Sequence, residues 1–300
     1  MDILRGKKED YRLTGLIGKG GMCQVYDAVP LCGGEECAVK IIRSDRGEDF
    51  MEKARMLFEN EKLILKRLTD SGVIGVPGFI DEGDGFMVME KVQGTVLQKF
   101  MTKRNKDDSS RRALELLLRL SKVLTGLHEL DPPVIHMDIK PSNVMITASG
   151  EVYLIDFGSA VTLYGYASGK EREQVPGTGT IRFAAPEQYG NIFVRDIRTD
   201  IYQFGRLAEA VAASMVTDRY LKSALTDIIC RCTMAKAAER YPCMRDVSSD
   251  IRSLMGNSRR NRLKFTLKEL LHGSNIRKPC LNDEDSFFID IVMTCDSINF

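Results

Sequence analysis

The beginning of the chain carries the pattern of short β-strands separated by glycine-rich breaks. Tyr11, Leu13 and Leu16 are interleaved with polar residues, and the apolar runs 25–29 and 37–42 follow at short intervals. Successive side chains of a strand point to opposite faces, so runs of this length fit the two sides of a sheet. The sequence therefore predicts a β-rich start with three strands.

A helical period replaces this pattern at residues 48–69. Apolar side chains recur there at steps of three or four residues and form one stripe, made by Ala54, Phe58, Leu65 and Leu68. Lys62 and Lys66 are expected on the opposite face of the same helix. Two further strands are predicted at 78–81 and 86–90.

Beyond the neighbourhood of Gly94 the pattern is mostly helical. A long helix is expected from Arg111 to Leu130, where Pro132 and Pro133 end it. Three more helices are expected near residues 200–215, 221–236 and 243–256. Neither an internal repeat nor a low-complexity tract interrupts this order.

This distribution predicts an α+β protein with two lobes that are joined near residue 91. The first lobe, residues 1–92, is a small antiparallel sheet with one main helix, and the second, residues 93–256, is larger and mostly helical. Residues 257–300 form a C-terminal extension of unknown role. Its basic residues and apolar side fit either a helix docked on the second lobe or a surface that binds a membrane or a partner.

Composition and charge give no support to several classes of partner. The 43 Lys and Arg balance 42 Asp and Glu, so the formal net charge of +1 gives no reason to expect nucleic acid or an anionic membrane. The eight cysteines and three histidines lack the spacings of a zinc site, which indicates reduced thiols in a cytoplasmic protein. No signal peptide is recognisable, and no run reaches the roughly 20 apolar residues that span a bilayer. The oligomeric state stays open.

Candidate chemistry first appears around a predicted hairpin in the second lobe. The apolar runs 144–146 and 152–155 flank a turn, so Asn143 and Asp156 are expected to face each other at the open end of the hairpin. Asp138 lies shortly before Asn143 and reaches the same space. Carboxylate and amide oxygens suit Mg²⁺, which keeps waters and binds substrate phosphates. The alternative is that these polar residues only cap a loop between strands.

These residues resemble signature motifs of protein kinases. The segment 136–143 is similar to the kinase catalytic loop, and 156–158 is similar to the metal-binding triplet that follows it. The segments 17–22 and 186–188 look most like those of the bacterial, eukaryotic-like (Hanks-type) serine/threonine protein kinases. The resemblance implies a bilobal protein-kinase fold. It also implies that Asp138 is the base for the incoming hydroxyl and that Asn143 and Asp156 are metal ligands.

Lys40 ends a predicted strand and matches the kinase lysine that holds the α- and β-phosphates of ATP and pairs with a helix glutamate. Helical spacing selects the glutamate, because Glu61 falls on the apolar stripe while Glu59 points the other way. A carboxylate on a buried stripe is unfavourable unless it is paired, and Lys40 is the partner that removes the penalty. The alternative for Glu61 is an exposed helix residue.

The segment 17–25 resembles the kinase glycine-rich loop, whose backbone N–H groups approach phosphate without obstruction by Cβ atoms. Gly18 and Gly20 are kept, whereas Cys23 stands at the third glycine position and departs from the pattern. Taken alone, the segment also fits an ordinary hairpin with a loose tip. The Cys23 thiol could sense oxidation or alkylation, or it could be only a small side chain.

The segment 179–187 resembles the end of the kinase activation segment. Residues of the catalytic loop and of this segment indicate the expected substrate class. By this resemblance Glu187 pairs with Arg240, and Asp200 anchors the catalytic loop from a buried helix. Lys140, which would steady the γ-phosphate, and Thr180 are the choices of serine/threonine kinases rather than tyrosine kinases. The resemblance therefore implies transfer of a phosphoryl group to serine or threonine.

The same resemblance implies ATP with Mg²⁺, or Mn²⁺ as a substitute, and protein substrates. The implied catalytic residues are Asp138, Lys140, Asn143, Lys40 and Glu61. The implied nucleotide-binding residues are Ile17, Gly18, Lys19, Gly20, Gly21, Val25, Ala38, Lys40, Met89, Glu90, Val92, Met145 and Asp156. The implied metal ligands are Asn143 and Asp156.

Two departures from the kinase pattern concern regulation and docking. Met137 stands where many kinases have an arginine that binds a phosphorylated activation loop, and methionine cannot bind phosphate. We therefore expect activity to depend weakly on phosphorylation, with Thr162, Ser168 and Thr178 as candidate autophosphorylation sites. The short interval between the helices at 214 and 221 predicts a reduced substrate-docking surface.

Two other functions would share part of this residue pattern. A pseudokinase would use the same fold as a nucleotide-binding interaction module, and Cys23 and Met137 would be its first signs of decay. The intact catalytic set argues against it, because phosphoryl transfer depends on placing charges around the γ-phosphate. A small-molecule phosphotransferase would share Asp138 and Asn143, but the motif that ends at Glu187 and the long segment before it disfavour that class.

Overall fold

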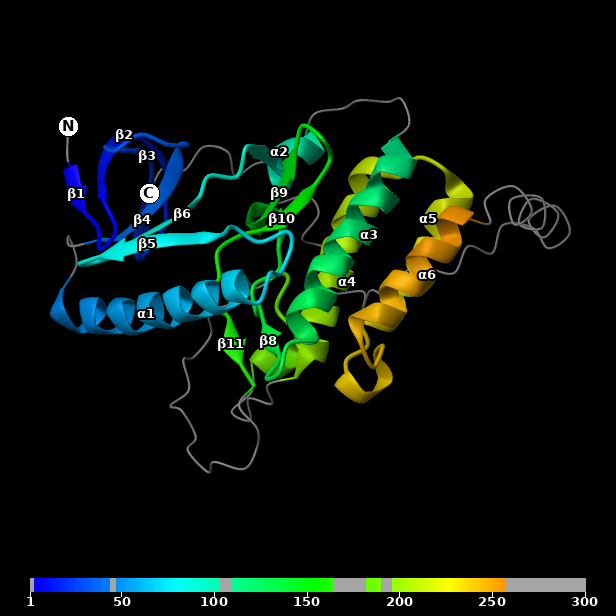
Figure 1. Cartoon of the computed structure of the whole chain (residues 1–300). Coiled ribbons are helices and arrows are strands. Elements are labelled where there is room, and N and C mark those ends of the chain that lie inside the picture. The colour runs from blue at the N-terminus through cyan, green and yellow to red at the C-terminus, as the bar shows by residue number, and fades with distance from the viewer. Residues whose placement is uncertain (1–2, 44–46, 103–108, 164–181, 190–195, 257–300) are drawn as a thin grey trace, which may run out of the picture.

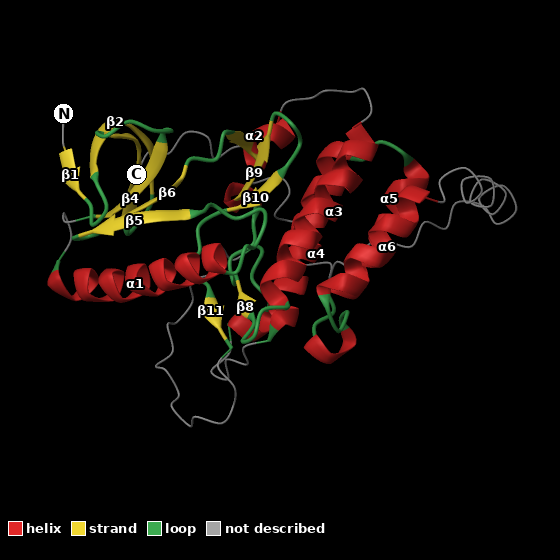
Figure 2. Ribbon diagram, viewed as in Figure 1, coloured by secondary structure: helices red, strands yellow, loops and turns green. Residues whose placement is uncertain are grey.

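The computed structural model describes residues 3–43, 47–102, 109–163, 182–189 and 196–256. They form a sheet-rich lobe and a helical lobe that lie next to each other (Figure 1). Strands dominate the first lobe and helices the second (Figure 2). The predicted α+β class, with a small antiparallel sheet and one main helix in the N-terminal lobe, is confirmed.

The first lobe is built on a six-stranded sheet in which every neighbouring pair is antiparallel. Its strands, in spatial order, are β1 (Ile3–Arg5), β2 (Asp10–Lys19), β3 (Cys23–Pro30), β4 (Cys37–Ile42), β6 (Phe86–Glu90) and β5 (Phe79–Gly83). A small core within this sheet buries Tyr11, Ala28, Cys37, Val39, Phe86 and Val88. The pattern did not predict β1, because a strand of three residues is too short to show a period.

Helix α1 (Glu48–Asp70) lies along the sheet and carries the stripe that its period predicted (Figure 1). Its inward residues are buried, namely Ala54, Phe58, Glu61, Leu65 and Leu68. The predicted position of Lys62 away from the sheet is wrong, because its side chain is only 11% exposed and its amine lies 3.0 Å from the carboxylate of Glu82 on β5. A helix against a sheet buries a wide stripe, so a residue beside Glu61 is covered as well.

The described part of the second lobe is built mainly of helices. They are α2 (Leu97–Thr102), α3 (Ser109–His128), α4 (Ile197–Met215), α5 (Arg219–Cys232) and α6 (Met244–Gly256). Helix α4 packs against α3 and α5, and α3 packs against α6. Only Val216, Thr217 and Asp218 separate α4 from α5, as the short interval predicted. Among the described residues, no helix is both long and apolar enough to cross a bilayer.

Short strands and 3₁₀ turns carry the segments between these helices. A three-stranded sheet contains β7 (Gly94–Val96), β9 (Val144–Thr147) and β10 (Val152–Leu154), and a two-stranded one contains β8 (Val134–Ile135) and β11 (Val161–Thr162). The 3₁₀ turns are η1 (Pro141–Asn143), η3 (Pro186–Gln188) and η4 (Ala237–Glu239). The segment between β8 and β9 holds three of the predicted catalytic residues, Asp138, Lys140 and Asn143.

The hairpin of β9 and β10 has a register one residue away from the predicted one. The paired strands place Asn143 opposite Ile155, whose N–H donates to the Asn143 carbonyl at 2.9 Å. The expectation that Asn143 faces Asp156 across the hairpin is therefore wrong. The turn holds an odd number of residues and uses Gly150 at a φ of 83°, which shifts the pairing by one. Asp156 follows the last paired position with a φ of 65°.

Candidate active site

A chain of charged side chains runs from α1 through β4 to the segment after β10. The Lys40 Nζ lies 2.6 and 2.7 Å from the two carboxylate oxygens of Glu61 and 2.9 Å from Oδ1 of Asp156. The side chains of Lys40 and Glu61 are buried, whereas that of Asp156 is 50% exposed. Glu59 is exposed and pairs with Lys62 instead, so helical spacing selected the glutamate that reaches Lys40.

The charges of Lys40 and Asp156 stabilise each other. Burial lowers the pKa of Lys40, but the carboxylates of Glu61 and Asp156 outweigh this effect and hold the pKa above its ordinary value. Lys40 in turn lowers the pKa of Asp156 to about 2. Lys40 is therefore an ammonium and Asp156 a carboxylate at neutral pH. A half-exposed, ionised carboxylate is a suitable ligand for a hard cation.

The strands bring several of the predicted nucleotide-binding residues to one face of the sheet. Val25 lies opposite Lys40, and Ala38 lies opposite Met89. Ala38 and Lys40 are two residues apart on β4 and so share a face, and residues directly opposite each other lie on the same face. The side chains of Val25, Ala38 and Met89 therefore share a face with the Lys40 ammonium.

The glycine-rich residues lie at the tip of the same sheet. Ile17, Gly18 and Lys19 end β2, and Gly20 and Gly21 lie in the turn to β3, where the Gly20 N–H donates to the Cys23 carbonyl at 2.8 Å. The backbone at Gly21 is open, because an added Cβ would meet no atom within 4 Å. The turn therefore offers accessible backbone beside the Lys40 face.

Three further predicted residues lie where the sheet lobe joins the helical lobe. Glu90 ends β6, and its carboxylate accepts the Gly78 N–H at 3.1 Å. Val92 follows in the connecting segment, and Met145 lies on β9 opposite Val96. They come from both lobes and so lie on either side of the junction between them.

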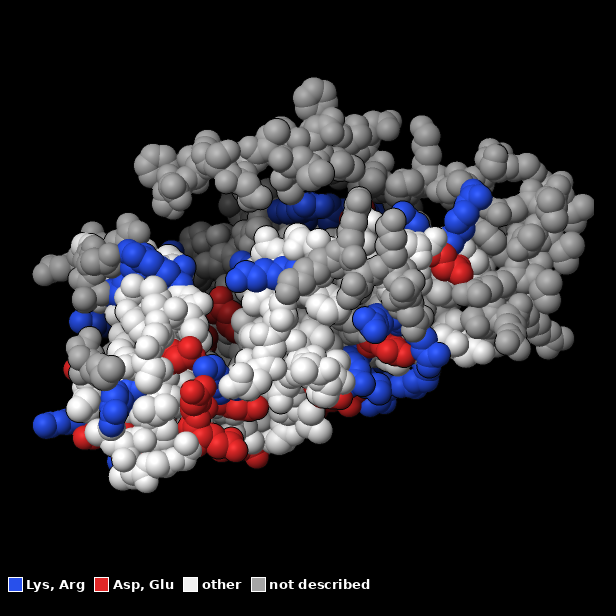
Figure 3. Space-filling view, turned by 90° about the horizontal axis from the view of Figure 1, so that it is seen from above, with Lys and Arg blue, Asp and Glu red and all other residues white. Residues whose placement is uncertain are grey.

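The loop before β9 brings three predicted catalytic side chains together. The Asn143 Nδ2 donates to a carboxylate oxygen and to the carbonyl of Asp138, at 3.0 and 2.9 Å. The Lys140 Nζ lies 2.8 Å from Oδ2 of Asp138. The positive charge of Lys140 also acts on Asp156 and helps to lower its pKa, so the two groups of charges are within electrostatic reach. From above, the surface is hollowed between the lobes, with acidic side chains at the bottom (Figure 3).

Asp200 on α4 fixes the backbone of this loop, as the resemblance implied. Its buried carboxylate accepts the N–H groups of His136 and Met137 at 2.8 and 2.9 Å and lies 2.9 Å from Nε2 of His128. Burial lowers the pKa of His136, so its ring is neutral. The His136 Nε2 lies 3.2 Å from the Ile155 carbonyl, which identifies Nε2 as the protonated nitrogen. The loop is thus held from two sides.

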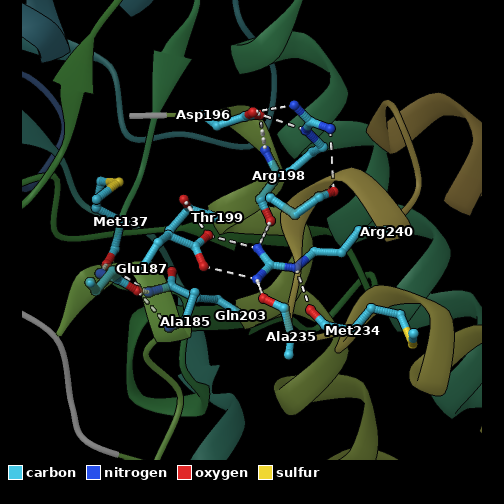
Figure 4. A network of polar contacts seen from close by, with 12 residues as sticks. Met137, Ala185, Glu187, Asp196, Arg198, Thr199, Gln203, Met234, Ala235 and Arg240 are labelled. Carbon is cyan, nitrogen blue, oxygen red and sulfur yellow. Dashed lines mark hydrogen bonds and ion pairs between the residues drawn. The ribbon is translucent and has the colours of Figure 1, made fainter. Parts of the chain in front are cut away.

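Arg240 fixes the described residues 182–189 to the helical lobe (Figure 4). Its buried guanidinium donates to both carboxylate oxygens of Glu187, at 2.7 and 2.8 Å, and to the Arg198 carbonyl at 2.9 Å. The Thr199 hydroxyl donates to Glu187 as well, at 2.9 Å. A bidentate pair of this kind has a strict geometry, so the predicted partnership of Glu187 and Arg240 fixes the end of the segment.

A comparison with known protein families agrees with this geometry. The family model described as protein kinase domain matches residues 11–272. The chain belongs to the protein kinase family. The match covers both lobes and includes Lys40, Asp138 and Asp156.

Curated relatives of this kinase domain carry the names of serine/threonine-protein kinases. The chain is 34% identical over 203 residues to the probable serine/threonine-protein kinase PknB of Corynebacterium glutamicum, a match that covers 65% of this chain and 30% of that protein. It is 32% identical over 195 residues to serine/threonine-protein kinase PknH of Mycobacterium tuberculosis, with coverage of 64% and 29%. It is 24% identical over 287 residues to serine/threonine-protein kinase PrkC of Bacillus subtilis, with coverage of 86% and 42%. The chain thus spans less than half the length of these relatives.

Cys23 has the environment of a small, unreactive side chain in the kinase glycine-rich loop. It is buried at the start of β3, and burial raises its pKa to about 11. The thiolate is the reactive form of cysteine, so this thiol reacts slowly near neutral pH. Of the two interpretations of Cys23, the structure favours the small side chain over the redox sensor.

Several predicted residues of the activation segment lie outside the described residues. They are Thr180 and the candidate phosphorylation sites Ser168 and Thr178. The third candidate, Thr162, ends β11 and is partly buried.

Two glutamines beside the catalytic loop were missed by the sequence analysis. Gln203 lies on α4 close to Asp200, and Gln188 directly follows Glu187. They are 1% and 9% exposed. A buried polar side chain needs hydrogen-bond partners, so an uncharged polar residue on the apolar face of a predicted helix was the signal that could have identified Gln203.

Proposed function

We propose that this protein is a serine/threonine protein kinase, which transfers the γ-phosphoryl group of ATP to serine or threonine hydroxyls of a protein. One observation carries the proposal: the Lys40–Glu61–Asp156 chain and the Asp138–Lys140–Asn143 cluster are both complete and lie at the junction of the two lobes. The names of the relatives support the same activity. The protein is a catalytically active kinase rather than a pseudokinase.

Each side chain has a role that its contacts allow. The oxygen of the substrate hydroxyl attacks the γ-phosphorus, the bond from that phosphorus to the bridging oxygen breaks, and ADP leaves. Asp138 orients the hydroxyl and accepts its proton. Lys140 beside Asp138 stabilises negative charge on the transferred group. Lys40, held by Glu61, binds the α- and β-phosphates on the face that Val25 and Ala38 line.

The residues present fit a magnesium ion. The amide nitrogen of Asn143 donates to Asp138, so its oxygen is the atom that would bind the metal. Asp156 is half exposed, and its lowered pKa keeps it ionised. When bound, Mg²⁺ neutralises phosphate charge and orients the phosphates, and Mn²⁺ can substitute for it. Asn143 and Asp156 are the proposed metal ligands.

The substrate class follows from Lys140 and from the relatives. The Lys140 amine lies 2.8 Å from the carboxylate of Asp138, the proposed base. Serine/threonine kinases resemble this chain in having a lysine at that position. We place this activity in the cytoplasm, on protein substrates. Nucleic acid is not expected as a partner, because a net charge of only +1 gives no reason for it. Nothing in these residues selects an oligomeric state.

Two other functions of the same fold are less well supported. A pseudokinase would bind nucleotide without turnover, yet each charged residue that phosphoryl transfer requires is present and makes the contacts described above. A small-molecule phosphotransferase would not need the Glu187–Arg240 pair, which fixes the segment that presents protein substrates in kinases.

Incubation of the purified protein with γ-labelled ATP, Mg²⁺ and a generic protein substrate tests the proposal. We expect label on serine and threonine, identified by phosphoamino-acid analysis, and its loss in Asp138→Ala and Lys40→Met. Nucleotide binding without transfer would identify a pseudokinase. Label of equal intensity in wild type and both variants would show a contaminating kinase and contradict the proposal.

A further inference from the structure

The backbone that carries Asp138 is held in an uncommon conformation. Met137 has a φ of 66°, in the left-handed region that residues other than glycine seldom adopt. Its side chain is buried and has no hydrogen-bond donor. A backbone in this region persists only where the surrounding contacts determine it. The contacts of residues 137–139 therefore decide where the Asp138 carboxylate points.

Two buried glutamine side chains supply contacts on both sides of Asp138. The Gln203 Nε2 donates to the Met137 carbonyl at 2.7 Å, and the Gln203 Oε1 accepts the Ile139 N–H at 2.8 Å. The Gln188 Nε2 donates to the same Met137 carbonyl at 3.1 Å. The peptide groups before and after Asp138 are thus both held by Gln203.

The two amides can form this network in only one orientation. The Gln203 Nε2 donates to Oε1 of Gln188 at 2.8 Å, and that oxygen also accepts the Ala185 N–H at 2.8 Å. Turning either amide over would point an oxygen at the Met137 carbonyl and a nitrogen at a backbone N–H. Both side chains are buried, so such unpaired groups are strongly disfavoured.

The network joins two parts of the kinase domain. Gln188 belongs to η3, next to Glu187, which Arg240 fixes (Figure 4). Gln203 belongs to α4, which also supplies Asp200. The described end of the activation segment is therefore bonded to the catalytic loop through neutral amides. In many kinases an arginine and a phosphate form a link between these parts, and Met137 cannot form that link.

We propose that Gln203 and Gln188 are positioning residues that hold the loop of Asp138 in its catalytic geometry and replace a phosphate-dependent contact. The proposal rests on the proposed kinase function and specifies its regulation. The unphosphorylated protein has the catalytic loop in place, because amide hydrogen bonds to the Met137 carbonyl and the Ile139 N–H do not require a phosphate.

Variants of the full 300-residue chain test this proposal. Gln203→Met keeps the size of the side chain and removes its hydrogen bonds. Gln203→Glu keeps an acceptor for Ile139 but loses the donor to Met137. Gln98→Glu is the matched control, because Gln98 is exposed on α2. Each protein is produced with a co-expressed phosphatase, shown by mass spectrometry to be free of phosphate, and assayed for kcat and for KM of ATP.

We expect Gln203→Met to lower kcat by about 10- to 100-fold, since small displacements of a catalytic group have effects of this size. The KM of ATP should stay within about twofold, because Lys40 and its sheet are untouched. Gln203→Glu should recover activity relative to wild type as the pH falls, because the protonated carboxyl regains a donor for Met137. Gln98→Glu should follow the wild-type pH profile. A loss of stability alone would not produce this pH dependence.

A second pair of variants tests the shared carbonyl. Gln188→Met should lower kcat, and the double variant with Gln203→Met should lose less than the product of the two single effects, because both amides bind Met137. Effects that multiply, with no coupling, would contradict a shared role.

Three outcomes would overturn the inference. Wild-type kcat in both Gln203 variants would overturn it and leave the kinase function standing. A wild-type protein that is active only when phosphorylated would do the same. If Gln203→Met does not fold, as judged by circular dichroism, Gln203→Glu decides, and a pH profile parallel to wild type overturns the proposal. Absence of phosphoryl transfer by wild type under every condition would instead remove the proposed function itself.

Discussion

The Lys62 amine on α1 lies 3.0 Å from the carboxylate of Glu82 on β5, and Lys62 directly follows Glu61 in the helix. The amines of Lys66 and Lys7 lie 2.8 Å from the same carboxylate. Glu82 therefore joins α1, the sheet and the start of the chain. Because the position of α1 sets whether Glu61 reaches its lysine on β4, this cluster supports the active site from outside it.

Glu82→Gln should destabilise the protein near neutral pH. Hydrogen bonds from Lys66 and the other two lysines lower the pKa of Glu82 to about 2, from an ordinary value of 4.5. A depressed folded-state pKa contributes stability above the unfolded pKa, and this contribution is lost as the pH falls toward the folded value. We expect the free energy of unfolding to fall by about 1–2 kcal/mol at about pH 7.

Urea unfolding at several pH values measures this effect. The difference between wild type and Glu82→Gln should shrink below about pH 4.5 and disappear near about pH 2. Glu52→Gln, at an exposed position of α1, is the control and should change little at any pH. A difference for Glu82→Gln that is independent of pH would contradict the ion-pair explanation.

Glu61→Ala should inactivate the enzyme far more than Glu59→Ala does. Without Glu61, the buried ammonium of Lys40 loses the carboxylate that holds it toward the nucleotide face. We expect kcat/KM to fall by about 100-fold for Glu61→Ala and by less than about threefold for Glu59→Ala, which is exposed. Steady-state assays with varied ATP measure both, and similar losses in the two variants would contradict the assignment of Glu61.

Removal of phosphate should leave most of the activity. Met137 cannot bind a phosphate, and the catalytic loop is already held by Asp200. We expect phosphatase-treated protein to keep kcat within about threefold of the autophosphorylated protein. The measurement compares initial rates after phosphate content is established by mass spectrometry. An initial lag that shortens with enzyme concentration would indicate activation by phosphorylation and contradict the expectation.

Alkylating reagents should distinguish Cys23 from Cys32. Burial raises the pKa of Cys23 to about 11, so only about one thiol in three thousand is ionised near pH 7.5. Cys32 is exposed and should be labelled by iodoacetamide first, as followed by peptide mass spectrometry. Cys23→Ala should keep activity within about twofold. Rapid labelling of Cys23 with matching loss of activity would restore the redox-sensor interpretation.

Two glycines in helices should respond to alanine with opposite signs. A Cβ at Gly205 on α4 would lie 2.6 Å from the Cβ of Cys232 and 2.7 Å from Cγ2 of Thr233, so Gly205→Ala should destabilise the fold by about 2 kcal/mol. A Cβ at Gly126 on α3 would meet Val73 at 3.6 Å, an ordinary contact. Gly126→Ala should therefore stabilise the helix by about 0.5–1 kcal/mol. Thermal or urea unfolding of both variants tests the pair.

The local sequence pattern predicted an element or a side-chain partner correctly where that feature depended on a single helix or strand. The stripe of α1 selected Glu61 because helical period alone separates it from Glu59. The same period placed Lys62 wrongly, because burial there depends on β5, a strand that comes later in the chain. The hairpin register was wrong by one residue, since the sequence did not show that Gly150 takes a positive φ.

The sequence by itself determined the order of the strands and helices predicted from its periods, the two-lobed division, and the residue types of the Lys40, Asp138 and Asp156 motifs. These depend on neighbours along the chain, which a period or a motif records. Only the tertiary structure decided that Glu82 forms ion pairs with three lysines. The same holds for the hydrogen bonds that Gln188 and Gln203 both donate to the Met137 carbonyl. Those contacts join residues far apart in the chain, so their energies depend on how the lobes pack and leave no periodic signal.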